Sequence, residues 1–327
     1  MESTIIINKT IMHMCDLEHR KTVLSDNLIE QNEESLEYFK KKLCKAVNSS
    51  SKKEIVVGSM HELLVRSKNM TNNDDTFIEE TREITKKIYQ LATQIEMMPN
   101  FNIVVYDCYI DGCRFIYILK LNYKLVPCTS IQDNMVKLTY KQMIPNAGSA
   151  IEEAIIIDCE NSKLYLIEKK FEIDGKKDFY LNPQWIKGEC LLSDKDKLKL
   201  AKKVVKKIDS IYQVTNNTAL PEMKRLIQEK RINNESINAI DLVKTVLKDD
   251  YQAEEESESM LRDLGISEND TIESVDGKLD LCKIKINDNI VITMPVEDYI
   301  SGDFIRKTKK EDGTFEVSIV AQDLKVE

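Results

Sequence analysis

The sequence predicts an α+β fold whose first half contains an antiparallel sheet. Strand-like segments follow one another between residues 102 and 173 without an intervening helix, which disfavours a series of β-α-β units. Helical patterns with a period near 3.6 residues lie before and after this strand region. The pair Asp-Gly, which type I′ hairpin turns prefer, recurs beside the strand-like segments. It occurs at Asp111-Gly112, Asp174-Gly175, Asp276-Gly277 and Asp312-Gly313.

The length and composition indicate a globular protein with more than one domain. The chain has 327 residues, of which 42% are hydrophobic and 31% are charged. We expect an α+β domain over residues 1–216, a helical connector with an acidic segment over 217–260, and a small β-rich domain over 261–327. No apolar run approaches the length of a membrane span, and we find no export-signal pattern. We therefore expect no membrane partner, a cytoplasmic location and reduced cysteines.

The N-terminal elements follow from short periodic patterns. Residues 4–15 alternate and are rich in isoleucine, which predicts a strand, and Val23-Leu24 continues an antiparallel pairing after a polar turn. Residues 33–47 predict a helix, because apolar residues recur at steps of three and four. We expect four lysines to occupy the other faces of this helix: Lys40, Lys41, Lys42 and Lys45. A second helix is predicted over residues 75–98, just before Pro99.

Two hairpins are predicted in the sheet region. Residues 102–109 and 113–123 flank the first Asp-Gly turn, and residues 152–158 and 164–173 form the second pair. In the strand over 113–123, strict alternation places Ile116, Ile118 and Lys120 on one face. The aromatic and leucine side chains of the same strand share the opposite face.

The second half begins with a strong helical pattern. Residues 194–213 carry an apolar stripe that includes Ala201, Val205 and Ile208. Another helical tract runs from Pro221 into the 240s and is broken near Asn233-Asn234. Three later segments have strand character: residues 278–286, 289–294 and 315–320.

Charge is distributed unevenly along the chain. The total is −9, but residues 248–327 hold 10 Lys/Arg and 21 Asp/Glu, a net of −11, so residues 1–247 carry +2. The acidic run over residues 249–258 has two interpretations. It is either a solvated junction between domains or the charged start of a helix.

The first candidate site is a row of lysines on the helix over residues 194–213. Lys195, Lys199, Lys202 and Lys206 step by four, three and four and therefore lie on one side of the helix, with Lys203 and Lys207 beside them. The row spans about 18 Å of the helix axis, and duplex DNA presents about one phosphate per 1.7 Å. Lysine is a point charge, which suits phosphate contacts better than base recognition.

The basic region continues beyond this helix. Residues 193–231 hold 11 basic and 5 acidic side chains, a net of +6, and include Lys224 and Arg225. The alternative interpretation is an ordinary solvated helix face.

A second candidate site is a metal-dependent nuclease centre. Phosphodiester cleavage of this kind needs carboxylates that hold a divalent cation and a lysine beside the attacking water. Asp158 ends one predicted strand, and Glu168 and Lys170 lie two residues apart on the next one. The alternative interpretation is an ordinary pair of sheet strands.

Other kinds of site find little support. There is no His-x-x-x-His or Cys-x-x-Cys spacing for zinc, no Gly-rich phosphate loop, and no G-x-S-x-G nucleophile turn. We therefore expect no cofactor and no bound metal.

The order of several short motifs resembles the bacterial 37-kDa nucleoid-associated protein family. The motifs that carry the resemblance are Met12-His13, Asp16-Leu17-Glu18, Val23-Leu24-Ser25-Asp26, the strand from Ile118 to Tyr123, Ile144-Pro145, Glu153-Ala154-Ile155-Ile156, Glu168-Lys169, Asp174-Gly175 and Asp312-Gly313-Thr314. They extend over nearly the whole chain. The resemblance implies a cytoplasmic protein that localises to the nucleoid and binds double-stranded DNA, and it implies no established enzymatic activity.

Three hypotheses follow from these patterns. The leading one is a non-enzymatic, nucleoid-associated protein that binds double-stranded DNA through its phosphates. The second is the metal-dependent nuclease. The third is a protein-interaction scaffold that acts through the acidic C-terminal region, which could face a protein partner or a second copy of the chain.

Overall fold

The computed structural model describes residues 4–30, 32–132, 135–215, 218–233, 235–275, 281–286, 290–310 and 314–320. The chain divides into two compact units, Met1–Ser193 and Asp194–Glu327. The division comes immediately before the helix that carries the lysine row, whereas the sequence places the first boundary after residue 216.

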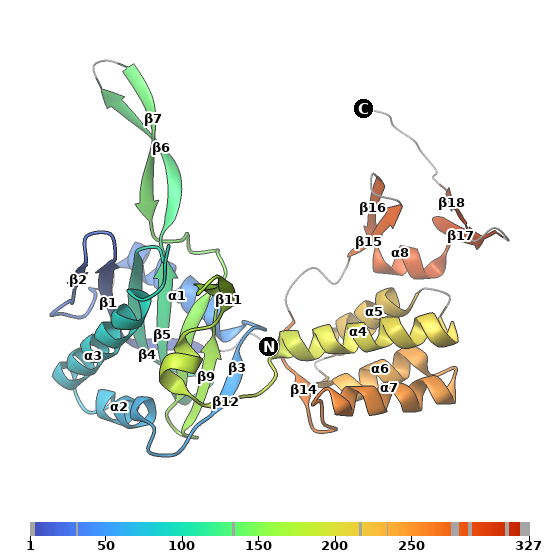
Figure 1. Ribbon diagram of the computed structural model, residues 1–327, viewed down its shortest axis with the longest axis horizontal. Helices are drawn as coiled ribbons and strands as arrows, with labels where there is room; N and C mark the ends of the chain where they lie inside the picture. The colour runs from blue at the N-terminus through green and yellow to red at the C-terminus, as the bar shows by residue number, and fades with distance from the viewer. Residues whose placement is uncertain are drawn as a thin grey trace. The chain divides into compact units, whose positions relative to one another are not determined.

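The first unit is built on an eight-stranded sheet with the strand order β12-β3-β9-β8-β5-β4-β1-β2 (Figure 1). Every pair of neighbouring strands is antiparallel. The strands are β1 (Ile5–Asp16), β2 (Lys21–Val23), β3 (Lys53–Val56), β4 (Phe101–Ile110), β5 (Cys113–Asn122), β8 (Glu153–Asp158), β9 (Lys163–Ile167) and β12 (Glu189–Cys190). This sheet confirms the predicted α+β class and its antiparallel character.

Helices cover both faces of the sheet. Helix α1 (Glu33–Val47) packs on one face with Val104, Tyr106 and Leu119. Helices α2 (Glu62–Met70) and α3 (Asp74–Ala92) pack on the other face, where Ile116 and Ile118 contribute to the core. The alternation predicted for β5 is therefore confirmed. Because both faces are covered, β4 is buried along almost its whole length.

The two Asp-Gly turns that the structure describes have the predicted backbone. Asp111 has φ 51° and Gly112 φ 87°, and Asp174 and Gly175 have φ 50° and 75°. Positive φ at both central positions is the mark of a type I′ turn. The second turn joins β10 (Phe171–Ile173) to β11 (Lys176–Asp178). Asp276-Gly277 and Asp312-Gly313 lie outside the described residues.

Two details of the helices differ from expectation. Lys42 is not on an exposed face of α1, because its side chain is buried and its ammonium group donates to Ser149 Oγ at 2.7 Å. Its long aliphatic chain fills apolar space while its end reaches a polar partner. Helix α3 ends at Ala92 rather than near residue 98. Met97 has φ 58°, a left-handed conformation that is incompatible with a right-handed helix.

A long hairpin stands out from the sheet between β5 and β8. It consists of β6 (Lys124–Gln132) and β7 (Met135–Met143), which pair only with each other among the described strands (Figure 1). The sequence patterns did not predict it. A π-helical turn, Asn182–Ile186, completes the described helical elements of this unit.

The second unit begins with four packed helices. They are α4 (Asp194–Tyr212), α5 (Ala219–Ile232), α6 (Ala239–Leu247) and α7 (Tyr251–Asp263). The predicted helix over 194–213 and the break near residue 233 are both confirmed. The acidic run over residues 249–258 is the charged start of α7, with Asp250 as its N-cap, so the second of its two interpretations holds.

Smaller β elements complete the second unit. A short ladder joins β13 (Ile237–Asn238) to β14 (Thr271–Ile272). Two hairpins follow, β15 (Leu281–Ile286) with β16 (Ile290–Pro295) and β17 (Ile305–Lys309) with β18 (Phe315–Ile319), and α8 (Val296–Ser301) lies between them. Cys282, Val296, Tyr299 and Ile305 form their small core. Within the described part of the chain, no helix has the length and apolar character needed to cross a membrane.

Candidate nucleic-acid interface

Helix α4 is amphipathic, and this decides where its lysines lie. Leu198, Ala201, Val204, Val205 and Ile208 form the buried stripe that packs against α5, α6 and α7. Residues at steps of three and four share a helix face, so Lys199, Lys203 and Lys206 lie on the side away from this stripe, while Lys202 lies at its edge. Acidic residues in the first turn complement the positive end of the helix dipole.

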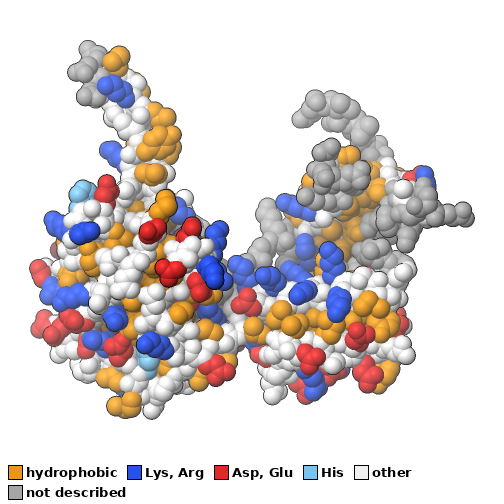
Figure 2. Space-filling view, in the orientation of Figure 1, with side chains coloured by type: hydrophobic (Ala, Val, Ile, Leu, Met, Phe, Trp, Pro, Cys, Tyr) orange, Lys and Arg blue, Asp and Glu red, His pale blue; other side chains and the backbone are white. Residues whose placement is uncertain are grey.

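The outer members of the row are available to a ligand. Lys199, Lys203, Lys206 and Lys207 are exposed, as is Lys195. In the part of the chain that the structure describes, no carboxylate lies within ion-pair distance of the first four. In Figure 2, basic side chains gather over α4. These four lysines therefore form a line of ammonium groups that have no carboxylate partner in the described part of the chain.

Lys202 and Lys224 occupy a more enclosed position than the rest of the set. Both are half-buried. Burial, and then the positive charge of Lys224, lowers the pKa of Lys202. The ammonium group of Lys224 donates to the carbonyl oxygen of Leu281 at 2.9 Å, which links α5 to β15. An anion at this position would relieve the repulsion between the two lysines.

Arg225 is already neutralised by its own helix. Its guanidinium group donates to Glu222 at 2.7 and 3.0 Å and to Glu229 at 2.9 Å. Hydrogen bonds to Glu222 raise the pKa of Arg225 above its ordinary value. Of the predicted basic set, Arg225 is thus the residue least available to an external phosphate.

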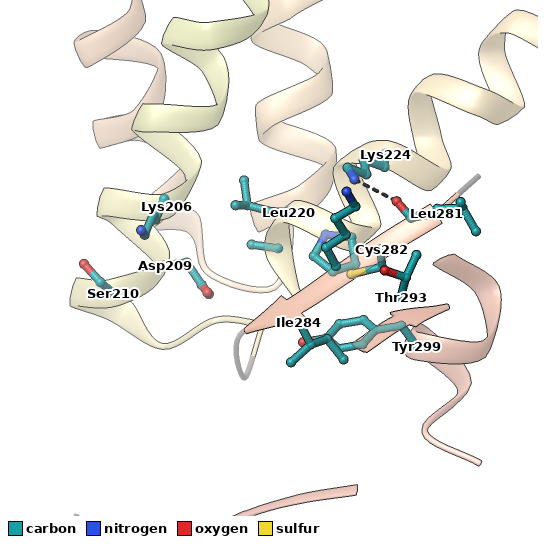
Figure 3. Close-up of a pocket in the computed structure, with 13 residues that line it drawn as sticks. Lys206, Asp209, Ser210, Leu220, Lys224, Leu281, Cys282, Ile284, Thr293 and Tyr299 are labelled. Carbon is teal, nitrogen blue, oxygen red and sulfur yellow. Dashed lines mark hydrogen bonds between the residues drawn. The ribbon is translucent and has the colours of Figure 1, made fainter. Parts of the chain in front are cut away.

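A hollow of about 940 Å³ adjoins the lysine row. Lys206 of α4 and Lys224 of α5 lie on its helical side, while Cys282, Ile284 and Tyr299 form the apolar side opposite (Figure 3). Lys283 of β15 also lines it. Three cationic side chains therefore surround one depression in the second unit.

Two lysines of this region were not in the predicted set. Lys197 pairs with Asp270 at 2.7 Å and donates to the carbonyl oxygen of Thr271 at 3.2 Å, so it ties α4 to β14. Lys283 reaches the hollow because β15 folds back toward α5. Neither position could be found from periodicity, since each depends on a contact between segments far apart in sequence.

The predicted nuclease residues do not come together. β8 and β9 pair Asp158 with Lys163 at the turn, and Ala154 with Ile167 at the opposite end. Glu168 follows Ile167, so the two carboxylates are separated by about five strand positions, or about 17 Å. A shared divalent cation requires ligands within about 2–2.6 Å of the ion. Among the described residues, no group of three His, Cys, Asp or Glu side chains is placed to hold a metal.

Each of these three residues has a local role instead. Asp158 accepts hydrogen bonds from the backbone amides of Glu160 and Asn161 at 3.1 and 2.9 Å and so orders the β8–β9 turn. The Glu168 carboxylate is buried, accepts from the Asn182 amide at 3.0 Å, and lies 3.6 Å from the Lys53 ammonium group. Burial raises the pKa of Glu168. Lys170 lies over the ring of Phe179, with its Nζ atom 4.9 Å from the ring centre.

The motif residues Lys120 and Glu153 meet inside the sheet. Lys120 Nζ lies 2.6 Å from Glu153 Oε2, and both side chains are almost fully buried. Asn122 donates to the same carboxylate oxygen at 2.7 Å, and Tyr180 donates to the other at 2.8 Å. Two of the short motifs, far apart in sequence, thus form one buried polar network.

The segments that carry these motifs lie within the range matched by a family model. The family model described as nucleoid-associated protein YejK matches residues 11–319. The chain belongs to this nucleoid-associated family. The match includes α4, the β6–β7 hairpin and the Lys120–Glu153 network, and it extends into both units. No curated protein matches the chain.

Proposed function

We propose that the chain binds double-stranded DNA through phosphate contacts made by the lysine row of α4, and that it acts at the nucleoid without catalysis. The observation that carries the proposal is that four exposed lysines of α4 have no carboxylate partner among the described residues: Lys199, Lys203, Lys206 and Lys207. Ammonium groups on one rigid helix can replace the counterions of several neighbouring phosphates. Membership in a nucleoid-associated family supports the same conclusion.

Lysine contacts of this kind predict a steep but sequence-independent salt dependence. With about four to six phosphate contacts, the logarithm of the binding constant should fall with the logarithm of salt concentration at a slope of about −4 to −5. Duplexes of unrelated sequence should bind with similar affinity, because phosphate contacts carry no direct sequence information.

The decisive variant reverses the charge of three exposed lysines in the row. Lys199→Glu, Lys203→Glu and Lys206→Glu together should weaken binding to all duplexes and make the slope less negative by about 3. Lys202 is left intact, because it is half-buried and its loss could disturb packing. Fluorescence anisotropy with a labelled duplex at several salt concentrations provides the measurement.

A control of equal charge separates the row from net charge. Lys40→Glu, Lys68→Glu and Lys176→Glu change three exposed and separate lysines of the first unit. This control should retain a slope near that of the parent protein. Equal losses in the two triple variants would mean that overall charge, and not the α4 row, governs binding. A chain that binds no duplex at low salt yet retains protein partners would favour the scaffold hypothesis instead.

A further inference from the structure

The hollow beside α4 is formed by helices and strands of the second unit. Lys206, Asp209 and Ser210 come from α4, where steps of three and four place them side by side. Leu220 and Lys224 come from α5, and residues of β15, β16 and α8 form the other side (Figure 3). The volume of about 940 Å³ lies within the range of pockets that hold cofactor-sized ligands, about 300–1,000 Å³.

The charged side chains of this hollow are mainly cationic. Lys206 and Lys283 are exposed, and Lys224 is half-buried. In the described part of the chain, none of these three lysines lies within ion-pair distance of a carboxylate. Of the described lining residues, only Asp209 carries a carboxylate, and its Oδ1 atom already accepts from the amide and the hydroxyl of Thr215, at 2.8 Å each. The walls therefore attract an anion.

The side opposite the α4 and α5 lysines is apolar. Cys282 and Tyr299 belong to the small core of the C-terminal hairpins, and Ile284 packs against that core. In Figure 3 the ring of Tyr299 lies beside Ile284 at the edge of the hollow. A small inorganic anion would contact the lysines and leave this apolar side in water. The hollow therefore suits an anion that also carries a flat, partly apolar group.

We propose that this hollow binds a nucleoside di- or triphosphate, with its phosphates among the three lysines and its base against Ile284 and Tyr299. A chain of phosphates carries several negative charges, which matches several separate ammonium groups. A nucleobase has a flat face that packs on aromatic side chains. Asp209 and Ser210 lie next to Lys206 and can accept hydrogen bonds from ribose hydroxyls.

Other anions use fewer of these features. A fatty acid has one carboxylate, so most of the lysine charge would stay unneutralised. A phosphate of duplex DNA would contact the lysines but leave the apolar side uncovered. Lys206 also belongs to the α4 row, so DNA and a free nucleotide share the same phosphate chemistry at this position. The two sources are separated by a measurement without DNA and by a lysine outside the row.

Nucleotide binding to the full chain without DNA is the first measurement, so its outcome is independent of the proposed DNA contacts. Calorimetric titration at low salt, without divalent cations, should give ATP or GTP a dissociation constant of about 10–100 μM. Tripolyphosphate and adenosine should each bind more weakly by about tenfold or more, because each lacks one half of the ligand. Equal affinity for ATP, GTP and tripolyphosphate would overturn the proposal, since charge alone would then explain the binding.

Lys283→Met tests the hollow itself, because Lys283 is exposed, lines the hollow and lies outside the α4 row. It should weaken nucleotide binding by about tenfold, the effect of losing one charge-assisted hydrogen bond. Lys199→Met is the matched control. It removes an exposed lysine of α4 that is not among the described lining residues, so nucleotide affinity should stay near that of the parent protein. Unchanged circular dichroism and Tm confirm that each variant is folded.

Two further results would contradict a nucleotide site. One is a parent chain that binds neither ATP nor GTP at about 1 mM. The other is an equal loss of nucleotide affinity in Lys283→Met and Lys199→Met, which would mean that binding follows the overall positive charge of the region. A parent chain that binds no nucleotide, and whose Lys283→Met variant loses duplex affinity, would assign the hollow to DNA phosphates instead.

Discussion

At the scale of single residues, Lys120 is a charged side chain buried inside the first unit, with only 2% of it exposed. Burial lowers its pKa, while Glu153 opposes that shift. The ammonium group also lies 4.6 Å from the ring centre of Phe101 and 5.1 Å from that of Phe171. Aromatic faces and a hydrogen-bonded carboxylate thus replace the lost water. Removing one partner leaves the other charge buried and unpaired.

We predict that Lys120→Met lowers the free energy of unfolding by about 3–5 kcal/mol. Adding Glu153→Gln to the same chain should recover part of this loss, because the uncompensated charge is then gone. Urea unfolding of the single and double variants measures both effects.

An exposed pair in the same sheet supplies the control for this prediction. Lys163 and Glu54 lie 3.1 Å apart, with side chains 47% and 28% exposed. Lys163→Met should cost less than about 1 kcal/mol, because water screens that pair. If Lys120→Met lowered the free energy of unfolding no more than Lys163→Met, burial of the ion pair would not be the source of the effect.

His13 is a buried residue that should make the stability of the protein depend on pH. Its ring accepts from the Ser25 amide at 3.1 Å and lies 3.0 Å from Thr81 Oγ1. Burial, and then the charge of Arg82, lowers the pKa of His13 from 6.5 to about 4. The folded state therefore holds this ring neutral over a pH range in which the unfolded chain protonates it.

The direction of the resulting pH dependence is fixed by that shift. Between pH 6.5 and about 4 the unfolded chain binds more protons at this position, so stability should fall as the pH falls through this window. The loss should reach at most about 3 kcal/mol and then level off. Urea unfolding at several pH values, with His13→Gln as comparison, measures it. An equally steep pH dependence in His13→Gln would rule out His13 as its source.

At the scale of elements, α4 and the β6–β7 hairpin use the same device in different ways. The helix separates its apolar stripe from its lysines with a period of 3.6 residues. The strands, with a period of two, place all three hairpin lysines on one face, where Val126, Met135 and Met143 also lie. In α4 the apolar stripe is covered by neighbouring helices, and the exposed lysines remain accessible to a ligand. In the hairpin the face that carries Leu125, Ile131 and Val136 is exposed to solvent.

Helix α7 shows why the acidic C-terminal region cannot simply be cut away. Ala253, Ser257 and Leu261 are buried, and the helix packs against α4 and α6. Glu258 pairs with Lys244 and Arg262, and Tyr212 of α4 donates to Glu256 at 2.7 Å. A chain that ends at residue 247 would lack this helix and expose the stripe on α4. Substitution of exposed acids is therefore the better way to examine the effect of charge.

At the scale of the whole molecule, a negative total charge coexists with a basic helix. The net charge of −9 repels DNA at long range, whereas the lysine row attracts phosphates only when it is in contact with them. Salt screens the two effects differently, because the Debye length is about 30 Å at 0.01 M and about 8 Å at 0.15 M.

Neutralising exposed acids should therefore strengthen binding only at low salt. Asp249→Asn, Glu255→Gln and Asp263→Asn together remove three exposed negative charges from the second unit. We expect duplex affinity to rise by about two- to fivefold at low ionic strength and to stay unchanged near physiological salt. Anisotropy titrations under both conditions measure the difference. A gain that persists at high salt would mean that these acids mask the site directly.

The sequence predicted much of the fold because its patterns are local. Helix α1 begins and ends at the predicted residues 33 and 47, and the Asp111-Gly112 turn has the expected backbone. The hairpin β6–β7 was missed, although apolar and polar residues alternate between Val136 and Lys141 of β7. Lys42 was placed wrongly because helical position alone did not reveal the pocket near Ser149 that receives it.

The sequence by itself determined the α+β class, the main periodic elements and the alignment of lysines on one side of α4. These properties follow from the side-chain periods of helices and strands, 3.6 and two residues. Those periods are local and do not depend on how the elements pack. Tertiary structure alone decided that Lys199, Lys203 and Lys206 have no carboxylate partner among the described residues and that Arg225 is neutralised. It also placed Asp158 and Glu168 at opposite ends of a hairpin. Pairing and separation depend on distances between atoms of different elements, and only the packed chain sets those distances.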